Sequence, residues 1–201
     1  MNVILITGAT RGIGAAIAHA FDTSETQLIL TGTNESEVAS LNATSAPNRQ
    51  YVCVDFSNSE SLNKFVEFIS NLSRLDVCVN NAGINIIKPL EDVTEQDFDM
   101  LHTINYKAPF RICQAAALIM RRQQRGHIVN IASIWSTVTK AGRSLYTGTK
   151  TGLVGMSRTM AVELAKDNVL VNCVSPGFTL TDLTRQSLSE DEIAAISSRI
   201  P

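Results

Sequence analysis

Two residues of types that can exchange a proton, Tyr146 and Lys150, stand four positions apart. Four positions make about one helical turn, so on a helix the two side chains share one face. A phenol has an ordinary pKa near 10 and is a poor acid–base catalyst at neutral pH. An ammonium about 4 Å away favours the phenolate by roughly 4 kcal/mol at an effective dielectric near 20, or about three pKa units. The spacing therefore predicts that Lys150 lowers the pKa of Tyr146 and that the pair moves a proton to or from a substrate.

A third chemical group, the hydroxyl of Ser133, follows the apolar run 127–131. At the end of a strand, such a hydroxyl can hydrogen-bond a substrate oxygen and stabilise charge that develops there. Each of these residues also has an ordinary structural explanation, because Tyr-x-x-x-Lys is common on helices and serine is common in turns. Their occurrence together with the features described next favours the catalytic interpretation.

Three glycines follow the first apolar run of the chain, in the pattern T-G-x-x-x-G-x-G over residues 7–14. A dinucleotide pyrophosphate needs backbone N–H groups at a helix N-terminus and no side chain that blocks its approach. The spacing is not the common G-x-G-x-x-G, and a glycine turn can also serve only to pack a helix on a strand. Its place at the first strand–helix junction favours nucleotide binding. The predicted contacts are with Gly8, Thr10, Arg11, Gly12, Ile13 and Gly14.

The residues after the second apolar run indicate which dinucleotide to expect. NAD sites place an acid at the end of the second strand to bind the ribose 2′-hydroxyl, and this sequence has Gly32 there. A small neutral residue leaves space for a 2′-phosphate, to which Arg11 and Thr33 can offer charge and a hydroxyl. Arg11 could also be an ordinary solvated charge. The sequence predicts NADP(H) in preference to NAD(H).

Short apolar runs alternate with longer amphipathic stretches, which indicates alternating strands and helices. Because the strand-like runs are apolar throughout, helices are expected on both faces of a parallel sheet. Right-handed crossovers then give a doubly wound α/β sheet, the Rossmann fold, in a single domain over residues 1–201. The predicted strands are 3–6, 28–30, 51–54, 75–79, 127–131 and 169–174, and the predicted helices are 12–21, 61–72, 98–122 and 145–166.

Composition narrows the class of protein. Of the 201 residues, 44% are hydrophobic and 18% charged, which is typical of globular rather than disordered chains. A net charge of -2 gives no reason to expect nucleic acid or a membrane surface as the partner. No apolar run is long enough for a membrane span, and because the first predicted strand starts at residue 3 we expect no signal peptide. The four cysteines and three histidines show no metal-ligand spacing, so we expect free thiols in a reducing cytoplasm and no metal site.

In their order along the chain, these motifs resemble those of the short-chain dehydrogenase/reductase family. The family carries T-G-x-x-x-G-x-G at the first turn, N-N-A-G after the fourth strand and Y-x-x-x-K downstream of a serine. Residues 7–14, 80–83 and 133–150 match this pattern. The resemblance implies a catalytic tetrad of Asn105, Ser133, Tyr146 and Lys150. It also implies that Lys150 holds the nicotinamide ribose and that Asn105, which taken alone could be a helix cap, supports a water that resupplies protons.

The resemblance extends the expected cofactor site beyond the glycine turn. In relatives, an acid after the third strand meets the adenine, and the backbone after a Pro-Gly pair holds the carboxamide. Asp55 and Thr179 stand at these positions, although many acyl-carrier-protein reductases have Ile or Val in place of Thr179. The implied contacts are with Asp55, Phe56, Asn81, Ala82, Gly83, Tyr146, Lys150, Pro176, Gly177 and Thr179.

The overall pattern is most similar to that of 3-oxoacyl-acyl-carrier-protein reductases. This implies a cytoplasmic NADP(H)-dependent enzyme of fatty acid biosynthesis that reduces the ketone of a small molecule or an acyl thioester. The loops expected to select the substrate, 84–90, the one around Trp135 and 178–187, diverge most, so a reductase of a sugar, polyol or other small ketone is an alternative. Trp135 itself could be a pocket wall or an exposed packing residue. The resemblance further implies a homodimer or homotetramer, in which helices 98–122 and 145–166 pair across a two-fold axis.

The sequence departs from the family pattern after the sixth strand. Relatives continue through another helix and a seventh strand, whereas this sequence stops at Pro201. A domain truncated in this way would leave its sixth strand as an unpaired edge beside exposed apolar surface. A second hypothesis is therefore a truncated relative that binds nucleotide with little or no turnover.

Overall fold

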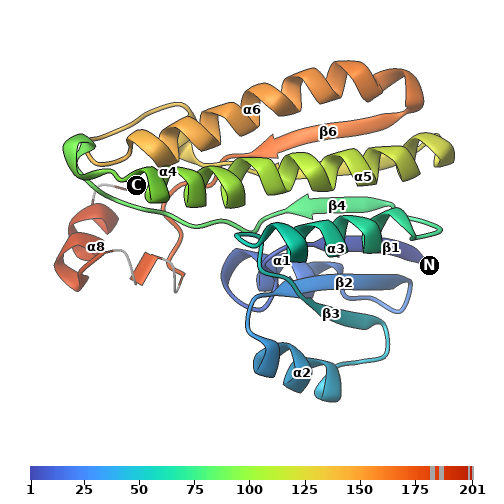
Figure 1. The fold of residues 1–201 in the computed structure, drawn as a ribbon. Coiled ribbons are helices and arrows are strands. Elements are labelled where there is room, and N and C mark those ends of the chain that lie inside the picture. Colours follow the sequence, from blue (N-terminus) through green and yellow to red (C-terminus); the bar gives the residue numbers. More distant parts are fainter. Residues whose placement is uncertain (182–183, 186–187, 199, 201) are drawn as a thin grey trace.

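Six parallel strands form one sheet in the computed structural model, which describes residues 1–181, 184–185, 188–198 and 200. Their order across the sheet is β3-β2-β1-β4-β5-β6 (Figure 1). The order reverses between β1 and β4, and in such sheets the ligand crevice lies at this reversal. The predicted doubly wound fold is confirmed. The strands are β1 Asn2–Ile6, β2 Thr26–Gly32, β3 Arg49–Cys53, β4 Val77–Asn80, β5 Gly126–Ile131 and β6 Val169–Val174.

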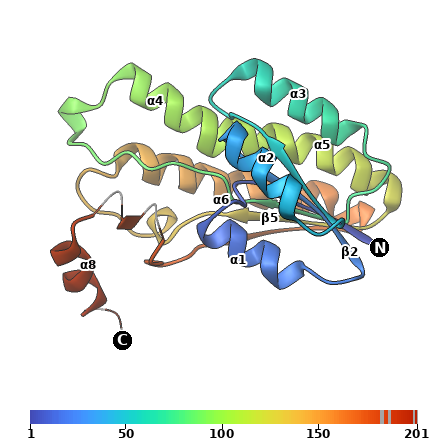
Figure 2. The same ribbon diagram turned by 90° about the horizontal axis from the view of Figure 1, so that it is seen from below.

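Helices cover the two faces of the sheet unequally. Figure 2 shows α3, α5 and α6 together on one face, with α1 on the other. Helix α8 lies beyond the carboxyl ends of the strands (Figure 1). The helices are α1 Gly12–Phe21, α2 Glu35–Thr44, α3 Ser59–Ser70, α4 Glu95–His102, α5 Ala108–Gln123, α6 Ser144–Leu164 and α8 Glu190–Ser197. The sequence had predicted neither α2 nor α8.

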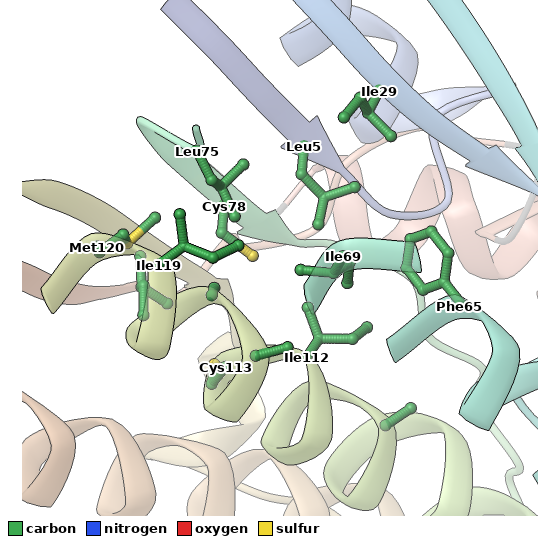
Figure 3. Close-up of a cluster of buried hydrophobic side chains, with 14 of the residues drawn as sticks. Leu5, Ile29, Phe65, Ile69, Leu75, Cys78, Ile112, Cys113, Ile119 and Met120 are labelled. Atoms are coloured by element: carbon green, nitrogen blue, oxygen red, sulfur yellow. The ribbon is translucent and has the colours of Figure 1, made fainter. Parts of the chain in front are cut away.

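Alternate residues of each central strand pack into different cores. Leu5 and Cys78 belong to a large core with side chains of α3 and α5, among them Phe65 and Ile112 (Figure 3). Their neighbours along the strands, such as Ile4 and Ile6, join a smaller core under α1. This arrangement explains why the strands are apolar without alternation, because both of their faces are buried.

The predicted helical region 98–122 is divided into three pieces. It begins at α4, where Thr94 and Asp97 form a capping box that satisfies the first backbone N–H groups. A π-helical turn, Thr103–Lys107, then separates α4 from α5. Such turns insert an extra residue into a helix and occur frequently at functional sites.

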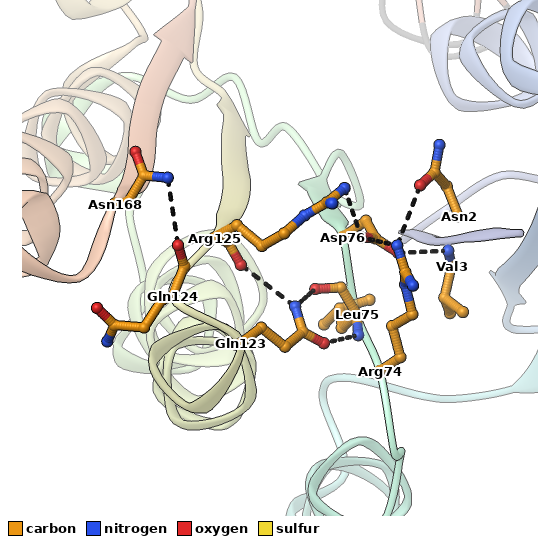
Figure 4. A network of polar contacts seen from close by, with 9 residues as sticks. All are labelled: Asn2, Val3, Arg74, Leu75, Asp76, Gln123, Gln124, Arg125 and Asn168. Carbon is orange, nitrogen blue, oxygen red and sulfur yellow. Dashed lines mark hydrogen bonds and ion pairs between the residues drawn. The ribbon is translucent and has the colours of Figure 1, made fainter.

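The amino ends of the central strands are joined by a polar network around Asp76 (Figure 4). Its carboxylate accepts hydrogen bonds from the Val3 backbone N–H at 2.9 Å and from Arg74 Nε at 2.7 Å. Arg125 Nη2 lies 3.2 Å from the same carboxylate. Burial works in the opposite direction, but the bonds from Arg74 and Val3 hold the pKa of Asp76 below its usual value. The network fixes β1 and β4 to the start of β5.

Strand β6 forms one edge of the sheet as the structure describes it. Its residues Val169 and Val171 point into the large core, whereas Leu170 and Val174, on the opposite face, are about half exposed. Among the described residues, no helix is both long and apolar enough to cross a membrane.

Candidate active site

A cleft opens at the carboxyl ends of the strands, where the loops after all six strands meet. Most of the residues predicted to bind cofactor or substrate lie on its walls, although they come from positions far apart in the chain. These are Gly8, Thr10, Arg11, Gly12, Ile13, Thr33, Asp55, Phe56, Asn81, Ala82, Gly83, Ser133, Tyr146, Lys150, Pro176, Gly177 and Thr179. Gly14 and Asn105 lie behind the walls. Positions 182–183 and 186–187 of the predicted substrate loop 178–187 lie outside the described residues.

The glycine turn is shaped by close backbone contacts. Gly8 has φ +63°, and a Cβ there would come within 2.9 Å of the Cα of Ala82. A Cβ on Gly14 would stand 2.2 Å from the carbonyl oxygen of Gly8. Any side chain at either position would push the turn away from the start of α1. The first turn of α1 therefore faces the cleft with bare backbone N–H groups, as an anion requires.

The loop after β4 is tied directly to this turn. Asn81 Nδ2 donates to the carbonyl oxygens of Thr7 and Gly8, at 3.0 and 2.9 Å. In return, the buried hydroxyl of Thr7 accepts from the backbone N–H groups of Asn81 and Ala82. The side chain of Asn81 is thus used to fix the two loops, and Thr7, which had not been predicted as a site residue, has the same role.

The end of β2 explains why no acid stands at position 32. A Cβ on Gly32 would lie 2.5 Å from the Thr10 methyl and 3.0 Å from Val38, so an aspartate there would require Thr10 to move. Arg11 and Thr33 are exposed and line the cleft on this side. At the neighbouring strand, the carboxylate of Asp55 is held in place by the N–H and hydroxyl of Ser57, at 2.9 and 2.7 Å.

Tyr146 and Lys150 face the same way from the first turns of α6. The Lys150 ammonium lies 5.7 Å from the centre of the Tyr146 ring and donates to the carbonyl oxygen of Ile131 at 2.8 Å. Lys150 is only 4% exposed. Burial lowers the pKa of Lys150 to about 8, partly offset by Cys173. Ser133, at the end of β5, is also buried and accepts from the N–H of Trp135.

The expected lowering of the Tyr146 pKa is wrong for this structure. Burial raises the pKa of Tyr146 above its usual value, and this outweighs the lowering by a hydrogen bond with Ser133 and by the charge of Arg143. The cation that favours the phenolate is therefore Arg143 rather than Lys150, whose ammonium is directed to the Ile131 carbonyl. The phenol stays protonated at neutral pH, which suits a proton donor.

Asn105 does not line the cleft but holds a loop that does. It is fully buried in the π-helical turn, where its Oδ1 accepts from the Ile84 N–H at 2.9 Å and its Nδ2 donates to the Ile84 carbonyl at 2.8 Å. A Cβ on Gly83 would come within 3.1 Å of the same Oδ1. Asn105 therefore fixes the loop after β4 through two hydrogen bonds to one residue.

Arg143 on the wall was not predicted as a site residue, whereas Trp135 and Asn85 belong to loops that were expected to select the substrate. Arg143 is buried, and its guanidinium carbon lies 5.2 Å from the centre of the Trp135 ring. Trp135 both lines the cleft and packs edge-on against Phe178, with ring centres 5.7 Å apart. Asn85 completes the wall on the side of the β4 loop. Arg143 could have been found from the sequence, since it stands three positions before Tyr146 and thus on the same side of the helix start.

Metal ligands do not gather in the described part of the chain. No group of three or more His, Cys, Asp or Glu side chains lies there in an arrangement that could hold an ion.

Comparison with known proteins gives a consistent result. The model of the family described as short chain dehydrogenase matches residues 2–192. The 3-oxoacyl-acyl-carrier-protein reductase of Rickettsia typhi is 36% identical over 197 residues, which cover 98% of this chain and 80% of the relative. The corresponding protein of Aquifex aeolicus is 38% identical over 206 residues, covering 100% and 82%. A solved structure from Beutenbergia cavernae, a candidate NAD(P)-dependent gluconate 5-dehydrogenase with bound NADP, has a TM-score of 0.90 and 29% identity, covering 100% of this chain and 82% of its own.

Proposed function

This chain belongs to the short-chain dehydrogenase family, and from that premise we propose that it reduces a ketone with NADPH, with Tyr146 as the proton donor. Family membership makes it an NAD(P)-dependent oxidoreductase. The observation that carries the finer proposal is the meeting of Tyr146, Ser133 and Lys150 on one wall of the cleft that also contains the glycine turn.

The cleft fits a dinucleotide phosphate. Gly8 packs against Ala82 and Gly14 against the Gly8 carbonyl too closely for a Cβ at either position, which keeps the turn tight at the start of α1. Arg11 and Thr33 would hold a ribose 2′-phosphate. Because position 32 is a glycine, no carboxylate stands there to repel the phosphate. Asp55 would meet the adenine, and the loop of Pro176 and Gly177 the carboxamide. A nicotinamide bound there supplies a hydride.

The protein's own part in the reaction is the transfer of a proton. The hydroxyl of Ser133 would donate to the ketone oxygen, and the protonated Tyr146 would give that oxygen its proton as negative charge develops. The charge of Arg143 would stabilise the phenolate that remains, and Lys150 would hold the nicotinamide ribose. Asn105 would keep the loop of Gly83 and Ile84 in position through its two hydrogen bonds.

The relatives indicate two kinds of ketone. The proteins from Rickettsia typhi and Aquifex aeolicus are named for 3-oxoacyl groups on a carrier protein, and the neighbour from Beutenbergia cavernae for gluconate. An acyl thioester is neutral around its ketone, whereas gluconate carries a carboxylate. The enzyme should therefore be tested on both an acetoacetyl thioester and a panel of small ketones, each with NADPH and with NADH.

Replacing Tyr146 by Phe tests the proposal most directly. Loss of the hydroxyl removes the proton donor, and we expect the rate of NADPH consumption to fall about 100- to 10,000-fold, which is typical for loss of a general acid. NADPH binding, measured by its fluorescence, should stay within about twofold because the ring remains. Tyr106→Phe is the matched control, since Tyr106 is next to Asn105 but does not line the cleft. Turnover by Tyr146→Phe at the native rate, or NADPH binding by the native chain with no turnover of any ketone, would contradict the proposal.

The same family membership leads us to expect self-association through α4, α5 and α6. Large apolar side chains on these helices are exposed, including Phe98 at 50%, Leu118 at 57% and Val162 at 80%. Burial of such side chains between two copies would stabilise a dimer. Analytical ultracentrifugation at micromolar concentration should show a dimer or a tetramer, and Val162→Glu should shift it toward monomer. A native chain that sediments only as a monomer would exclude this arrangement.

A further inference from the structure

Arg143 is a buried cation in the substrate part of the cleft. It directly precedes α6 and is 3% exposed, although an arginine normally keeps its charged end in water. Its Nε has no hydrogen-bond partner among the described residues. The described part of the chain also offers no carboxylate within ion-pair distance of its guanidinium.

The contacts of Arg143 do not compensate for this burial. The ring of Trp135 packs against the guanidinium, with 5.2 Å between the ring centre and the guanidinium carbon. Such packing stabilises a cation only modestly and leaves its N–H groups unbonded. Burial accordingly lowers the pKa of Arg143, opposed only by Tyr146. A buried charge without a partner is costly to a fold, and in a cleft its natural partner is a charged group of a ligand.

The position of Arg143 relates it to the reacting ketone. It stands three residues before Tyr146, close enough for its charge to act on the phenol. Its loop is joined to the loop after β4, because the Lys88 N–H donates to the Gly142 carbonyl at 3.2 Å. That second loop carries Asn85, whose Oδ1 is buried and also without a partner in the described structure. A polar pocket with an unpaired cation and an unpaired acceptor therefore lies beside the proton donor.

We propose that Arg143 binds an anionic oxygen group of the substrate, a carboxylate or a phosphate, so that this enzyme acts on a short ketone that carries a negative charge. The inference rests on the proposed reductase activity and names the substrate class of the same site. The guanidinium fork pairs with two oxygens of such a group, while Asn85 accepts a hydrogen bond from a hydroxyl or amide of the ligand. A neutral, apolar acyl chain in this pocket would leave both polar groups unsatisfied.

Acetoacetate and acetoacetamide test the proposal because they have the same shape and differ in charge. For the native enzyme we expect kcat/KM to be about 10- to 100-fold higher for the acid, as charge-assisted hydrogen bonds allow. Arg143→Met should lower kcat/KM for both substrates, because its charge acts on Tyr146, but far more for the acid, so that the ratio of acid to amide approaches one. Arg143→Lys should retain part of the preference for acetoacetate over acetoacetamide. Dihydroxyacetone phosphate and dihydroxyacetone form the second matched pair, which distinguishes a phosphate from a carboxylate.

Three outcomes would overturn the proposal. The native enzyme could show no preference for the charged member of either pair, or Arg143→Met could reduce both members equally, as a purely electrostatic effect on Tyr146 would. Arg143→Lys could also lose the preference for the charged ketone as completely as Arg143→Met does, which would indicate a structural role. Arg122→Met, which removes an exposed arginine near the end of α5, is the control and should retain native ratios. Folding of each variant is checked by NADPH fluorescence.

A binding measurement separates this inference from the reductase activity itself. In the presence of NADPH, acetoacetate should raise the melting temperature of native protein and of Tyr146→Phe, but not that of Arg143→Met. If this holds while no ketone is reduced, the anion site stands and the reductase proposal fails. If neutral ketones are reduced while acetoacetate stabilises neither protein, the reductase proposal stands and the anion site fails.

Discussion

The two ends of the parallel sheet hold buried charge in different ways. At the amino end, the carboxylate of Asp76 is 6% exposed and is bonded by Val3, Arg74 and Arg125. At the carboxyl end, Lys150 and Arg143 are just as buried, and no carboxylate in the described part of the chain pairs with either. The Lys150 ammonium donates to the Ile131 carbonyl, and the guanidinium of Arg143 packs on the face of Trp135.

This difference distinguishes buried charges that stabilise the fold from buried charges that serve the binding of a ligand. A buried charge that is satisfied by the chain itself contributes to the stability of the fold, and the pKa of Asp76 is lowered in agreement with this. A buried charge that the chain leaves unsatisfied lowers stability, and the pKa of Lys150 falls to about 8 because burial disfavours the ammonium. Charges of the second kind mark the place where a ligand completes the site.

Asp76→Asn should produce the larger stability loss. The amide keeps the shape but removes the charge and places a donor against N–H groups, so we expect the free energy of unfolding to fall by about 2 kcal/mol near neutral pH. Because the folded-state pKa of Asp76 is lowered, its contribution is present above the unfolded pKa and is lost as the pH falls through the folded value. The deficit of the variant in urea unfolding should therefore shrink in acid.

Glu60→Gln is the matched control for this change. Glu60 pairs with Lys64 on α3, but both side chains are about three-quarters exposed, so its loss should leave the free energy of unfolding nearly unchanged. An Asp76→Asn variant as stable as Glu60→Gln, or one whose deficit is independent of pH, would show that the network at the amino end is not a source of stability.

Much of the fold could be predicted because the signals are local. Continuous apolar runs identified all six strands, and the glycines of residues 7–14 located the start of α1. Two capping boxes in the sequence could have predicted the starts of two further helices. Thr94 with Asp97 locates the start of α4, and Ser189 with Glu192 the start of α8. Val38 is the single buried residue of helix α2, so the sequence there lacks the apolar stripe that reveals a helix.

The properties of the site that were not predicted depend on the folded surroundings. The spacing of Tyr146 and Lys150 placed both on one side of α6, but it could not show that the ammonium bonds to Ile131 or that burial raises the pKa of Tyr146. The π-helical turn that positions Asn105 likewise has no recognisable signal among the residues around it. Arg143 is recognisable as unsatisfied only when its neighbours are known, because an arginine in a sequence is usually solvated.

Lys150→Met should show a smaller pH effect, in the same direction as that of Asp76→Asn but in a higher pH range. The pKa of Lys150 is about 8 in the folded chain against about 10.5 when unfolded, so between these values the unfolded chain binds a proton that the folded chain has released. Below about pH 8, burial of the Lys150 ammonium lowers the free energy of unfolding by its full amount. As the pH rises above about 8, Lys150 loses its proton in the folded chain and the free energy of unfolding increases. From about pH 7 to pH 9, the native chain should gain about 1 kcal/mol relative to Lys150→Met in urea unfolding.

Comparison with the methionine variant cancels the titration of other buried groups, such as Cys113, whose pKa burial raises to about 12. Lys64→Met removes an exposed lysine and keeps Lys150, so its stability should follow that of the native chain across the same range. Parallel pH profiles for the native chain and Lys150→Met would mean that the ammonium is not held at a cost to the fold. The contrast between the two ends of the sheet would then rest on Arg143 alone.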